Sequence, residues 1–243
     1  MVDSLNMKQI VFTFDDGLES HFSRVAPFFL EHGLNATFYV TGRRHMWRQH
    51  RGKNLTEDGL AEPQITWIHK QGFEIGNHTL NHSCSPLVER EVVGMEMYLS
   101  NLDVPKPETF CFPGYRYPGV KHVEESERLL KSLGYKCART GYNLHGIKQL
   151  HEVPHLREII HHFPGNFIVY STMVMNDSYT FENFKKDLDD DRPEGAIPIV
   201  TAHGLVSDSR WDSMKKAALY AKEQGFQCVA MRDINPENTD EAD

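Results

Sequence analysis

The stretch QIVFTFDDG at residues 9–17 decides the fold prediction, because an apolar run ends there on two carboxylates and a glycine. A short continuous run of Val, Ile and Phe is typical of a strand that is buried on both faces. Asp15-Asp16-Gly17 taken alone usually marks a turn. We therefore predict a buried strand at residues 9–14, with two titratable side chains just beyond its C-terminal end.

Outward from this stretch, strand-like and helix-like segments alternate along the chain. Further strands are predicted at 35–41, 73–76, 109–112, 135–139, 156–160, 197–202 and 226–230. Helices are predicted at 23–32, 63–70, 86–99, 123–133, 181–188 and 211–224, and the polar segment 43–62 is predicted to be a loop insertion. Such alternation indicates parallel strands joined by crossover helices, and therefore an α/β barrel or a doubly wound sheet.

The chain length of 243 residues suits one (β/α) barrel domain. We predict an N-terminal segment at residues 1–7, one domain at 8–234, and a disordered acidic tail at 235–243 that is poor in apolar residues. Cys84, Cys111, Cys137 and Cys228 form no Cys-x-x-Cys pair. They are predicted to be buried free thiols, and a disulfide is the alternative if the protein is secreted.

The formal net charge is −8, and the basic residues form no run. This pattern argues against a nucleic-acid surface and against electrostatic attraction to an anionic membrane. No apolar stretch approaches the roughly 20 residues of a membrane-spanning helix. Residues 1–8 lack the apolar core of a secretory signal, which predicts a cytoplasmic protein, although a chain trimmed of its signal would look the same. The sequence leaves the oligomeric state open.

Titratable residues follow three of the predicted strands. Asp15 and Asp16 follow the first, His78 and His82 follow the strand at 73–76, and His203 follows the strand at 197–202. Active sites of α/β barrels gather at the C-terminal ends of strands, so these groups are expected to converge. On a helical turn, His78 and His82 would share one face.

Two imidazoles and one carboxylate form a His₂Asp set, which leaves positions free for water and substrate, as a catalytic metal site requires. Such a set suits Zn²⁺ or another first-row divalent ion. Adjacent aspartates after a strand point in different directions. One of them can therefore bind the metal while the other remains free as a base.

Three motifs resemble those of the polysaccharide deacetylase family, the NodB-homology group known as carbohydrate esterase family 4. They are TFDDG at 13–17, HTLNH at 78–82 and IVTAH at 199–203, and the resemblance covers roughly residues 8–234. It implies a distorted (β/α) barrel, one divalent cation (Zn²⁺, with Co²⁺ or Ni²⁺ as alternatives) and removal of N- or O-acetyl groups from a carbohydrate. The implied roles are general base for Asp15, metal ligands for Asp16, His78 and His82, and general acid for His203.

The third family motif is matched only in part, by FCFPGYRYP at 110–118. Cys111 stands where the family often places an arginine that orients the base. Arg116, five residues later, either takes that role or is a solvent-exposed or substrate-contacting arginine. A backbone N–H near Gly114 or Tyr115 is the expected oxyanion donor.

Two further family motifs also differ. The element that supports the acid histidine is not visible over residues 139–145, and Thr201 replaces the usual aliphatic residue two positions before His203. Tyr115 and Trp211 are candidates for stacking on a sugar ring, although aromatic side chains at such positions more often belong to the core.

Other hydrolase classes have less support. The segment HEVPH at 151–155 matches the zincin pattern, but Pro154 interrupts the helix that this pattern needs. Serine-esterase, dinucleotide-binding and P-loop motifs are missing from the sequence. A hydrolase of a non-sugar amide or imide remains the alternative within this fold. A metal-containing carbohydrate-binding module is disfavoured, because a binder has no need of a free base such as Asp15.

Overall fold

The computed structural model describes residues 8–42, 57–83, 86–115, 120–141, 167–171, 173–189 and 196–234. Its strands are β1 (Gln9–Phe14), β2 (Thr37–Val40), β3 (Glu74–Asn77), β4 (Thr109–Cys111), β5 (Cys137–Gly141), β6 (Ile168–Ser171), β7 (Met173–Met175), β8 (Ile199–Ala202) and β9 (Gln227–Val229). Its α-helices are α1 (Ala26–Glu31), α2 (Glu62–Lys70), α3 (Glu89–Ser100), α4 (Val120–Ser132), α6 (Phe181–Asp189) and α7 (Asp208–Glu223). A π-helical turn at His21–Val25 precedes α1, and 3₁₀ turns occupy Pro113–Tyr115 and Met231–Asp233.

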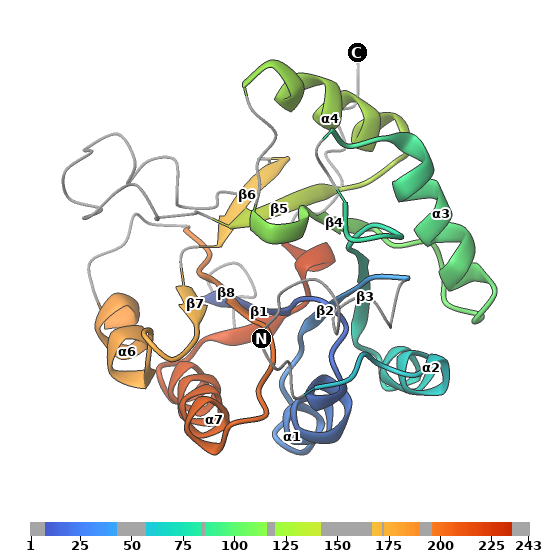
Figure 1. The fold of residues 1–243 in the computed structure, drawn as a ribbon. Coiled ribbons are helices and arrows are strands. Elements are labelled where there is room, and N and C mark those ends of the chain that lie inside the picture. Colours follow the sequence, from blue (N-terminus) through green and yellow to red (C-terminus); the bar gives the residue numbers. More distant parts are fainter. Residues whose placement is uncertain are drawn as a thin grey trace, which may run out of the picture.

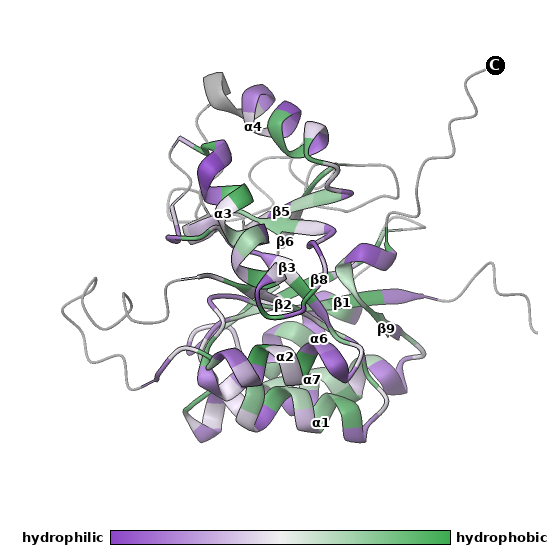
Figure 2. Ribbon diagram, turned by 90° about the vertical axis from the view of Figure 1, so that its right-hand side faces the viewer, coloured by the Kyte–Doolittle hydropathy of each residue, from purple (hydrophilic) through white to green (hydrophobic). Residues whose placement is uncertain are grey.

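The strands form one sheet in the order β6-β5-β4-β3-β2-β1-β8-β7, in which every described pairing is parallel. Figure 1 shows this sheet curled into a half-barrel with helices outside it. The predicted fold class, an α/β protein with a distorted barrel of parallel strands, is confirmed. Figure 2 shows these helices around the outside of the curl, with α1, α2, α6 and α7 below the strands and α3 and α4 above them.

Most predicted elements are present, with ends shifted by a few residues. The exceptions are β6 and β7, which the sequence did not predict. The predicted strand at 156–160 and most of the predicted insertion at 43–62 lie outside the described residues.

Strand β1 lies at the centre of the sheet because it pairs with three others. β9 pairs with its first half, β2 with its last two residues, and β8 with Val11 through Phe14. Every residue of β1 beyond Gln9 is buried. The C-terminal end of β1 is therefore hydrogen-bonded to a strand on each side, which fixes the backbone from which Asp15 and Asp16 project.

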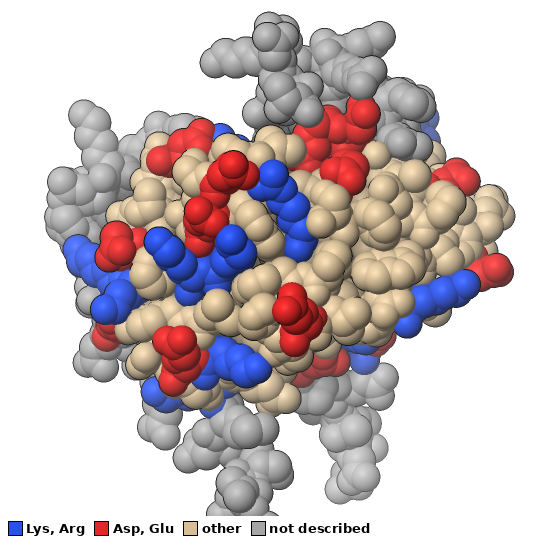
Figure 3. Space-filling view, turned by 90° about the horizontal axis from the view of Figure 1, so that it is seen from below, with Lys and Arg blue, Asp and Glu red and all other residues tan. Residues whose placement is uncertain are grey.

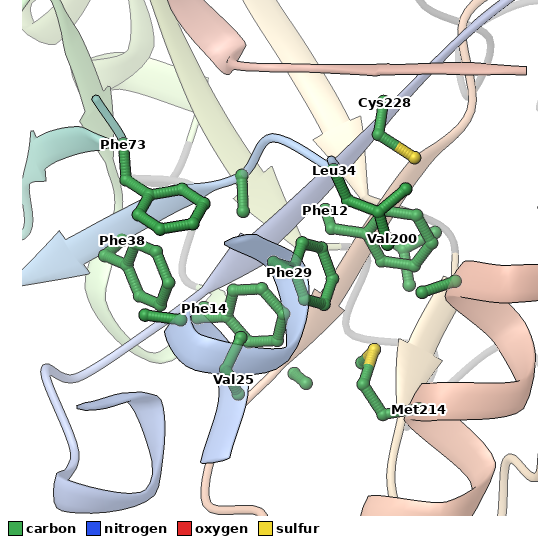
Figure 4. Close-up of a cluster of buried hydrophobic side chains, with 14 of the residues drawn as sticks. Phe12, Phe14, Val25, Phe29, Leu34, Phe38, Phe73, Val200, Met214 and Cys228 are labelled. Carbon is green, nitrogen blue, oxygen red and sulfur yellow. The ribbon is translucent and has the colours of Figure 1, made fainter. Parts of the chain in front are cut away.

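The core outside the barrel is rich in phenylalanine. Phe14 stacks on Phe38 with ring centroids 5.3 Å apart, and Phe29 meets both Phe12 and Phe14 edge to face. Figure 4 shows these rings lying between the sheet and the helices that cover it. Such aromatic pairs stabilise a core beyond the burial of their area, and here they fix α1 against the central strands.

A second core lies inside the curl of the sheet and closes its base. Met231 and Ile234, at the C-terminal 3₁₀ turn, pack with interior residues that include Val11, Cys137 and Ile199. Buried backbone N–H groups need acceptors, and the Met231 N–H donates to Thr37 Oγ1 at 2.8 Å. The half-barrel is therefore filled and closed at the end opposite the carboxyl ends of its strands.

The outer face of the helix layer carries charges of both signs. Figure 3 shows Lys and Arg side chains interspersed with Asp and Glu, with no extended basic patch on this face. None of the described helices is long and apolar enough to cross a bilayer. Cys111, Cys137 and Cys228 are buried free thiols, as predicted, and Cys84 lies outside the described residues.

Candidate metal and catalytic site

Five titratable residues meet where neighbouring strands end. Asp15 and Asp16 follow β1, His78 and His82 follow β3, and His203 follows β8. In the sheet these strands lie in the order β3-β2-β1-β8, so their carboxyl ends share one edge. The sequence placed all five residues at this edge, and the structure brings them together there. Asp15, Asp16 and His78 are buried, whereas His82 and His203 are half-buried.

Asp16, His78 and His82 direct their ligand atoms at one point. Asp16 Oδ1 lies 3.3 Å from His78 Nε2 and 3.2 Å from His82 Nε2. Among the described residues, neither Asp16 Oδ1 nor His78 Nε2 has a hydrogen-bond partner of good geometry, although both atoms are fully buried. An unpaired buried polar atom is costly, so two facing one another need a common partner. A divalent cation fits this donor set, because carboxylate oxygen and imidazole nitrogen are its usual ligands.

The other nitrogen of His78 is also fixed. His78 Nδ1 lies 2.9 Å from the backbone oxygen of Cys111, which can only accept a hydrogen bond. Nδ1 therefore carries a proton, and Nε2 is the nitrogen that faces the metal site. A second hydrogen bond of this kind is the usual support of a metal-binding histidine.

The loop that carries both histidines is not helical, and the prediction of a helical turn was wrong. Thr79 and His82 have φ of 66° and 54°, in the left-handed region that residues other than glycine rarely adopt. Asp16, at φ 78°, shares this strain. Such strain persists only where the surroundings over-determine the backbone, and it concentrates at functional sites.

Hydrogen bonds from the start of α3 hold the loop in this conformation. Glu91 accepts from the Asn81 backbone N–H at 2.8 Å and from the Asn81 side chain at 2.7 Å. Thr79 N–H donates to Asn77 Oδ1 at 2.8 Å, and Ser83 N–H donates to Thr79 Oγ1 at 2.9 Å. These contacts, rather than a helical repeat, bring His78 and His82 together.

Asp15, His78 and Cys111 form a second cluster of potential ligand atoms. However, the Arg139 guanidinium lies against it, with Nη2 2.6 Å from Cys111 Sγ and 2.5 Å from both Asp15 oxygens. A cation placed there would face the guanidinium charge at close range. The Asp16-His78-His82 set is therefore the candidate metal site.

Arg139, on β5, is the main feature that the sequence prediction missed. Its side chain is completely buried, and its ion pair with Asp15 joins two side chains that are 0% and 2% exposed. Burial alone would raise the pKa of Asp15, but the Arg139 guanidinium and the nearby His78 and His203 imidazoles hold it below its usual value. Asp15 is therefore ionised at neutral pH, as a proton acceptor must be.

The two aspartates thus have different surroundings. Burial alone would raise the pKa of Asp16 as well, but the imidazoles of His203, His78 and His82 keep it well below its usual value. The ion-pair partners of Asp16 among the described residues are imidazoles, whereas both oxygens of Asp15 face a guanidinium. This arrangement supports the predicted division between a metal ligand and a free base.

His203 stands at the open side of the site. Its Nε2 lies 3.9 Å from Asp15 Oδ2 and 3.8 Å from Asp16 Oδ2, and its side chain is 35% exposed. An imidazole with one side toward the carboxylates and the other toward solvent can reach an incoming ligand. This position suits proton donation to a leaving group.

His21 holds the backbone of His203 in place through a hydrogen bond to its carbonyl oxygen. Its Nδ1 accepts from the Leu18 N–H at 3.2 Å, so its Nε2 carries the proton and donates to the His203 carbonyl oxygen at 3.3 Å. Its ring is fully buried and packs against the rings of both Phe14 and Phe38, with centroids 5.6 Å and 5.9 Å away. Burial lowers the pKa of His21 to about 4, so the ring is neutral in the folded protein.

We expect His21 to make the folded protein less stable in acid. Between its folded pKa of about 4 and its unfolded value of 6.5, the unfolded chain binds a proton that the folded chain does not. The free energy of unfolding must therefore rise with pH in this window, by about 3 kcal/mol from this residue. Urea unfolding at several pH values should show a flatter dependence for His21→Asn, which keeps an acceptor for Leu18 but does not titrate. Equal slopes in both proteins would contradict this assignment.

The remaining predicted site residues are not brought into the cluster by any described contact. Trp211 lies in the helix layer on α7, where its ring meets Phe28 of α1 edge to face at 5.4 Å. Gly114 has φ 67° within the 3₁₀ turn after β4. Arg116 and the side chain of Tyr115 lie outside the described part of the chain. The roles of Tyr115, Arg116 and Trp211 toward a substrate, and the oxyanion donor near Gly114, stay predictions.

Comparison with known proteins points to one family. The family model described as polysaccharide deacetylase matches residues 3–138. Similar solved structures include the chitin deacetylase of Colletotrichum lindemuthianum, at 16% identity and a TM-score of 0.64 over 98% of this chain and 91% of that chain. They also include PdaA of Bacillus subtilis, a family 4 carbohydrate esterase, at 18% identity and a TM-score of 0.59 over 94% of this chain and 80% of that chain.

A third similar structure is a family 4 carbohydrate esterase from Streptomyces lividans in complex with acetate. It is 12% identical, with a TM-score of 0.58 over 92% of each chain. No curated protein matches the sequence. At these identities the solved structures support the fold, and the family model carries the assignment.

Proposed function

Because this chain belongs to the polysaccharide deacetylase family, we propose that it is a metal-dependent hydrolase that removes acetyl groups from a carbohydrate. The observation that carries the proposal is the pair of buried atoms Asp16 Oδ1 and His78 Nε2, which lack a hydrogen-bond partner among the described residues, beside a separate, ionised Asp15. A ligand set and a free base at the same strand ends are what metal-assisted hydrolysis requires.

Asp16, His78 and His82 would hold the cation, and we propose Zn²⁺, with Co²⁺ or Ni²⁺ as alternatives. A cation bound there supplies Lewis-acid chemistry, because it polarises a carbonyl oxygen and lowers the pKa of water. Three protein ligands leave room for the substrate on the side that His203 faces.

Asp15 and His203 perform the proton transfers. Asp15 Oδ2 accepts the proton of the attacking water, and its ion pair with Arg139 keeps it ionised until then. His203 donates a proton to the departing nitrogen or oxygen of the sugar. The two side chains lie 3.9 Å apart at their nearest atoms, so one acetyl group can lie within reach of both.

Acetate release tests this function. The protein loaded with Zn²⁺ should release acetate from at least one of chitooligosaccharides, acetylated xylan and peptidoglycan fragments, and treatment with a chelator should abolish the release. A cyclic imide is the comparison substrate, because the same residues suit an amide or imide hydrolase. Hydrolysis of the imide without acetate release from any glycan would transfer the assignment to that alternative.

A further inference from the structure

Arg139 is an unusual residue for the interior of a barrel. It is completely buried, on a strand whose described residues are all buried, and charged side chains are rarely buried unless they are paired. Its register partner on β4 is Cys111, so the two residues lie side by side at the same level of the sheet. The contacts of Arg139 are of two kinds: those that fix its own side chain, and those that it makes with Asp15.

Arg139 is fixed by interior side chains on two other strands, one of which is supported by a third strand. Its Nη1 donates to Thr201 Oγ1 of β8 at 3.0 Å, and its guanidinium carbon lies 5.3 Å from the centre of the Tyr39 ring on β2. Thr201 in turn donates to Ser171 Oγ of β6 at 2.6 Å. The side chain is thus clamped before it reaches Asp15, and its planar fork allows few other orientations.

The Nη2 atom of the Arg139 guanidinium contacts Asp15. Nη2 donates to both oxygens of the Asp15 carboxylate and to Cys111 Sγ. Cys111 Sγ itself lies 3.8 Å from Asp15 Oδ2, within reach of a weak S–H donor. Arg139, Cys111 and Asp15 therefore form a closed ring of hydrogen bonds immediately beside the Asp16-His78-His82 site.

We infer that Arg139 is the positioning residue of Asp15, reaching it from β5 across the small side chain of Cys111 and holding its carboxylate toward the metal site. Cys111 leaves space for the guanidinium because its side chain ends at the sulfur. A longer residue at this register position would occupy the volume that Arg139 Nη2 fills. The catalytic meaning of this inference rests on the proposed function, whereas the ion pair itself can be tested without a substrate.

Turnover gives the first test, with Arg139→Met removing the charge and Arg139→Lys retaining it without the fork. The loss should fall on kcat, by about 100-fold in Arg139→Met, because a misplaced catalytic group costs this much. KM should change by less than about threefold, and metal content should stay at the wild-type level. Arg139→Lys should recover part of the loss, by about tenfold. An Arg139→Met variant with wild-type kcat would overturn the inference.

A double variant separates positioning from general support of the fold. In an Asp15→Asn background, Arg139→Met should leave kcat unchanged within about threefold, because the carboxylate it positions is gone. Asp15→Asn/Arg139→Met should also have a higher Tm than either single variant, because neither charge is left unpaired. If the two losses of Tm simply add, Arg139 and Asp15 are not coupled and the inference fails.

This thermal comparison is independent of the reaction. It still decides the pairing if no acetylated substrate is hydrolysed, so a failed function and a failed inference give different results. It also keeps the inference testable if Arg139→Met alone does not accumulate as folded protein. Arg210→Met is the matched control, because Arg210 also pairs with a carboxylate, that of Asp177, but on the surface. It should change neither kcat nor, by more than about 2 °C, the Tm.

Discussion

Asp15→Asn is expected to keep its metal and to lose turnover by about 10²–10⁴-fold, the usual contribution of a positioned proton acceptor. An amide cannot take the proton of the attacking water, whereas Asp16, His78 and His82 remain to bind the cation. Metal analysis together with acetate release at saturating substrate measures both effects. Near-normal turnover would show that the two aspartates do not divide the work as their surroundings suggest.

The same substitution should also weaken the fold, and this must be separated from the loss of chemistry. It leaves the buried Arg139 guanidinium without its carboxylate, and breaking a buried ion pair costs about 3–5 kcal/mol. For a chain of this size the Tm should fall by roughly 10 °C, so turnover must be measured well below that temperature. Asp177→Asn is the matched control, because its arginine partner is at the surface. It should change the Tm by far less.

The second large effect concerns the metal ligands. We expect His78→Ala, His82→Ala and Asp16→Asn each to weaken metal binding by more than about 100-fold. Loss of a residue that only supports a metal ligand costs about 10–100-fold in affinity, and loss of a ligand should cost more. His78→Ala should be the most damaging, because His78 is the more buried of the two histidines and its Nδ1 is already held by Cys111. Competition with a chromophoric chelator measures these affinities, and activity should follow metal occupancy.

Two controls test whether the effect belongs to this site. His69→Ala removes a histidine on α2, away from the cluster, and should keep full metal content. His151→Ala/His155→Ala removes the zincin-like pair, which lies outside the described residues. Loss of metal from this double variant, with the metal retained in His78→Ala, would show that the metal binds at residues 151–155 instead.

The metal ligands could be found from the sequence because each stands directly after an apolar run. Asp16 and His78 follow buried strands, and the carboxyl ends of parallel strands lie at one edge whatever the details of the fold. The conformation of the His78–His82 loop could not be found this way. The left-handed φ angles at Thr79 and His82 accompany hydrogen bonds from this loop to the Asn77 side chain and to Glu91 of α3, and the four-residue spacing of the two histidines does not reveal these contacts.

Arg139 could not be predicted as a site residue from the sequence, for a physical reason. On a strand with one face in solvent, a charged residue indicates the solvent face, and this rule would place Arg139 on the outside of the strand predicted at 135–139. In a curled sheet covered by helices both faces are buried, so the arginine points into the barrel. Arg116 is the sequence candidate because it lies close along the chain to Cys111, where the family often has the arginine of its third motif. Arg139 is close to that position only across the sheet, where Cys111 and Arg139 are register partners.

Strands β6 and β7 were missed because each is only three or four residues long, with one residue between them. Their place in the sheet depends on partners rather than on local pattern. Ser171 of β6, for example, donates to the Ile199 carbonyl oxygen of β8 at 3.1 Å, which draws the two ends of the sheet toward each other. Contacts of this kind form only when the sheet curls, so no short segment of sequence predicts them.

The 3₁₀ turn at Met231–Asp233 determines from which end of the barrel a ligand can reach the site. It blocks the base of the half-barrel with Met231 and Ile234, and Arg232 N–H is tied to Glu74 at 3.0 Å. Among the described residues, approach to the five titratable groups is therefore from the carboxyl ends of the strands, where His203 is partly exposed. Under the proposed function, a polymeric substrate would therefore lie across this edge and present one acetyl group at a time, and acetate would leave by the route through which that group entered.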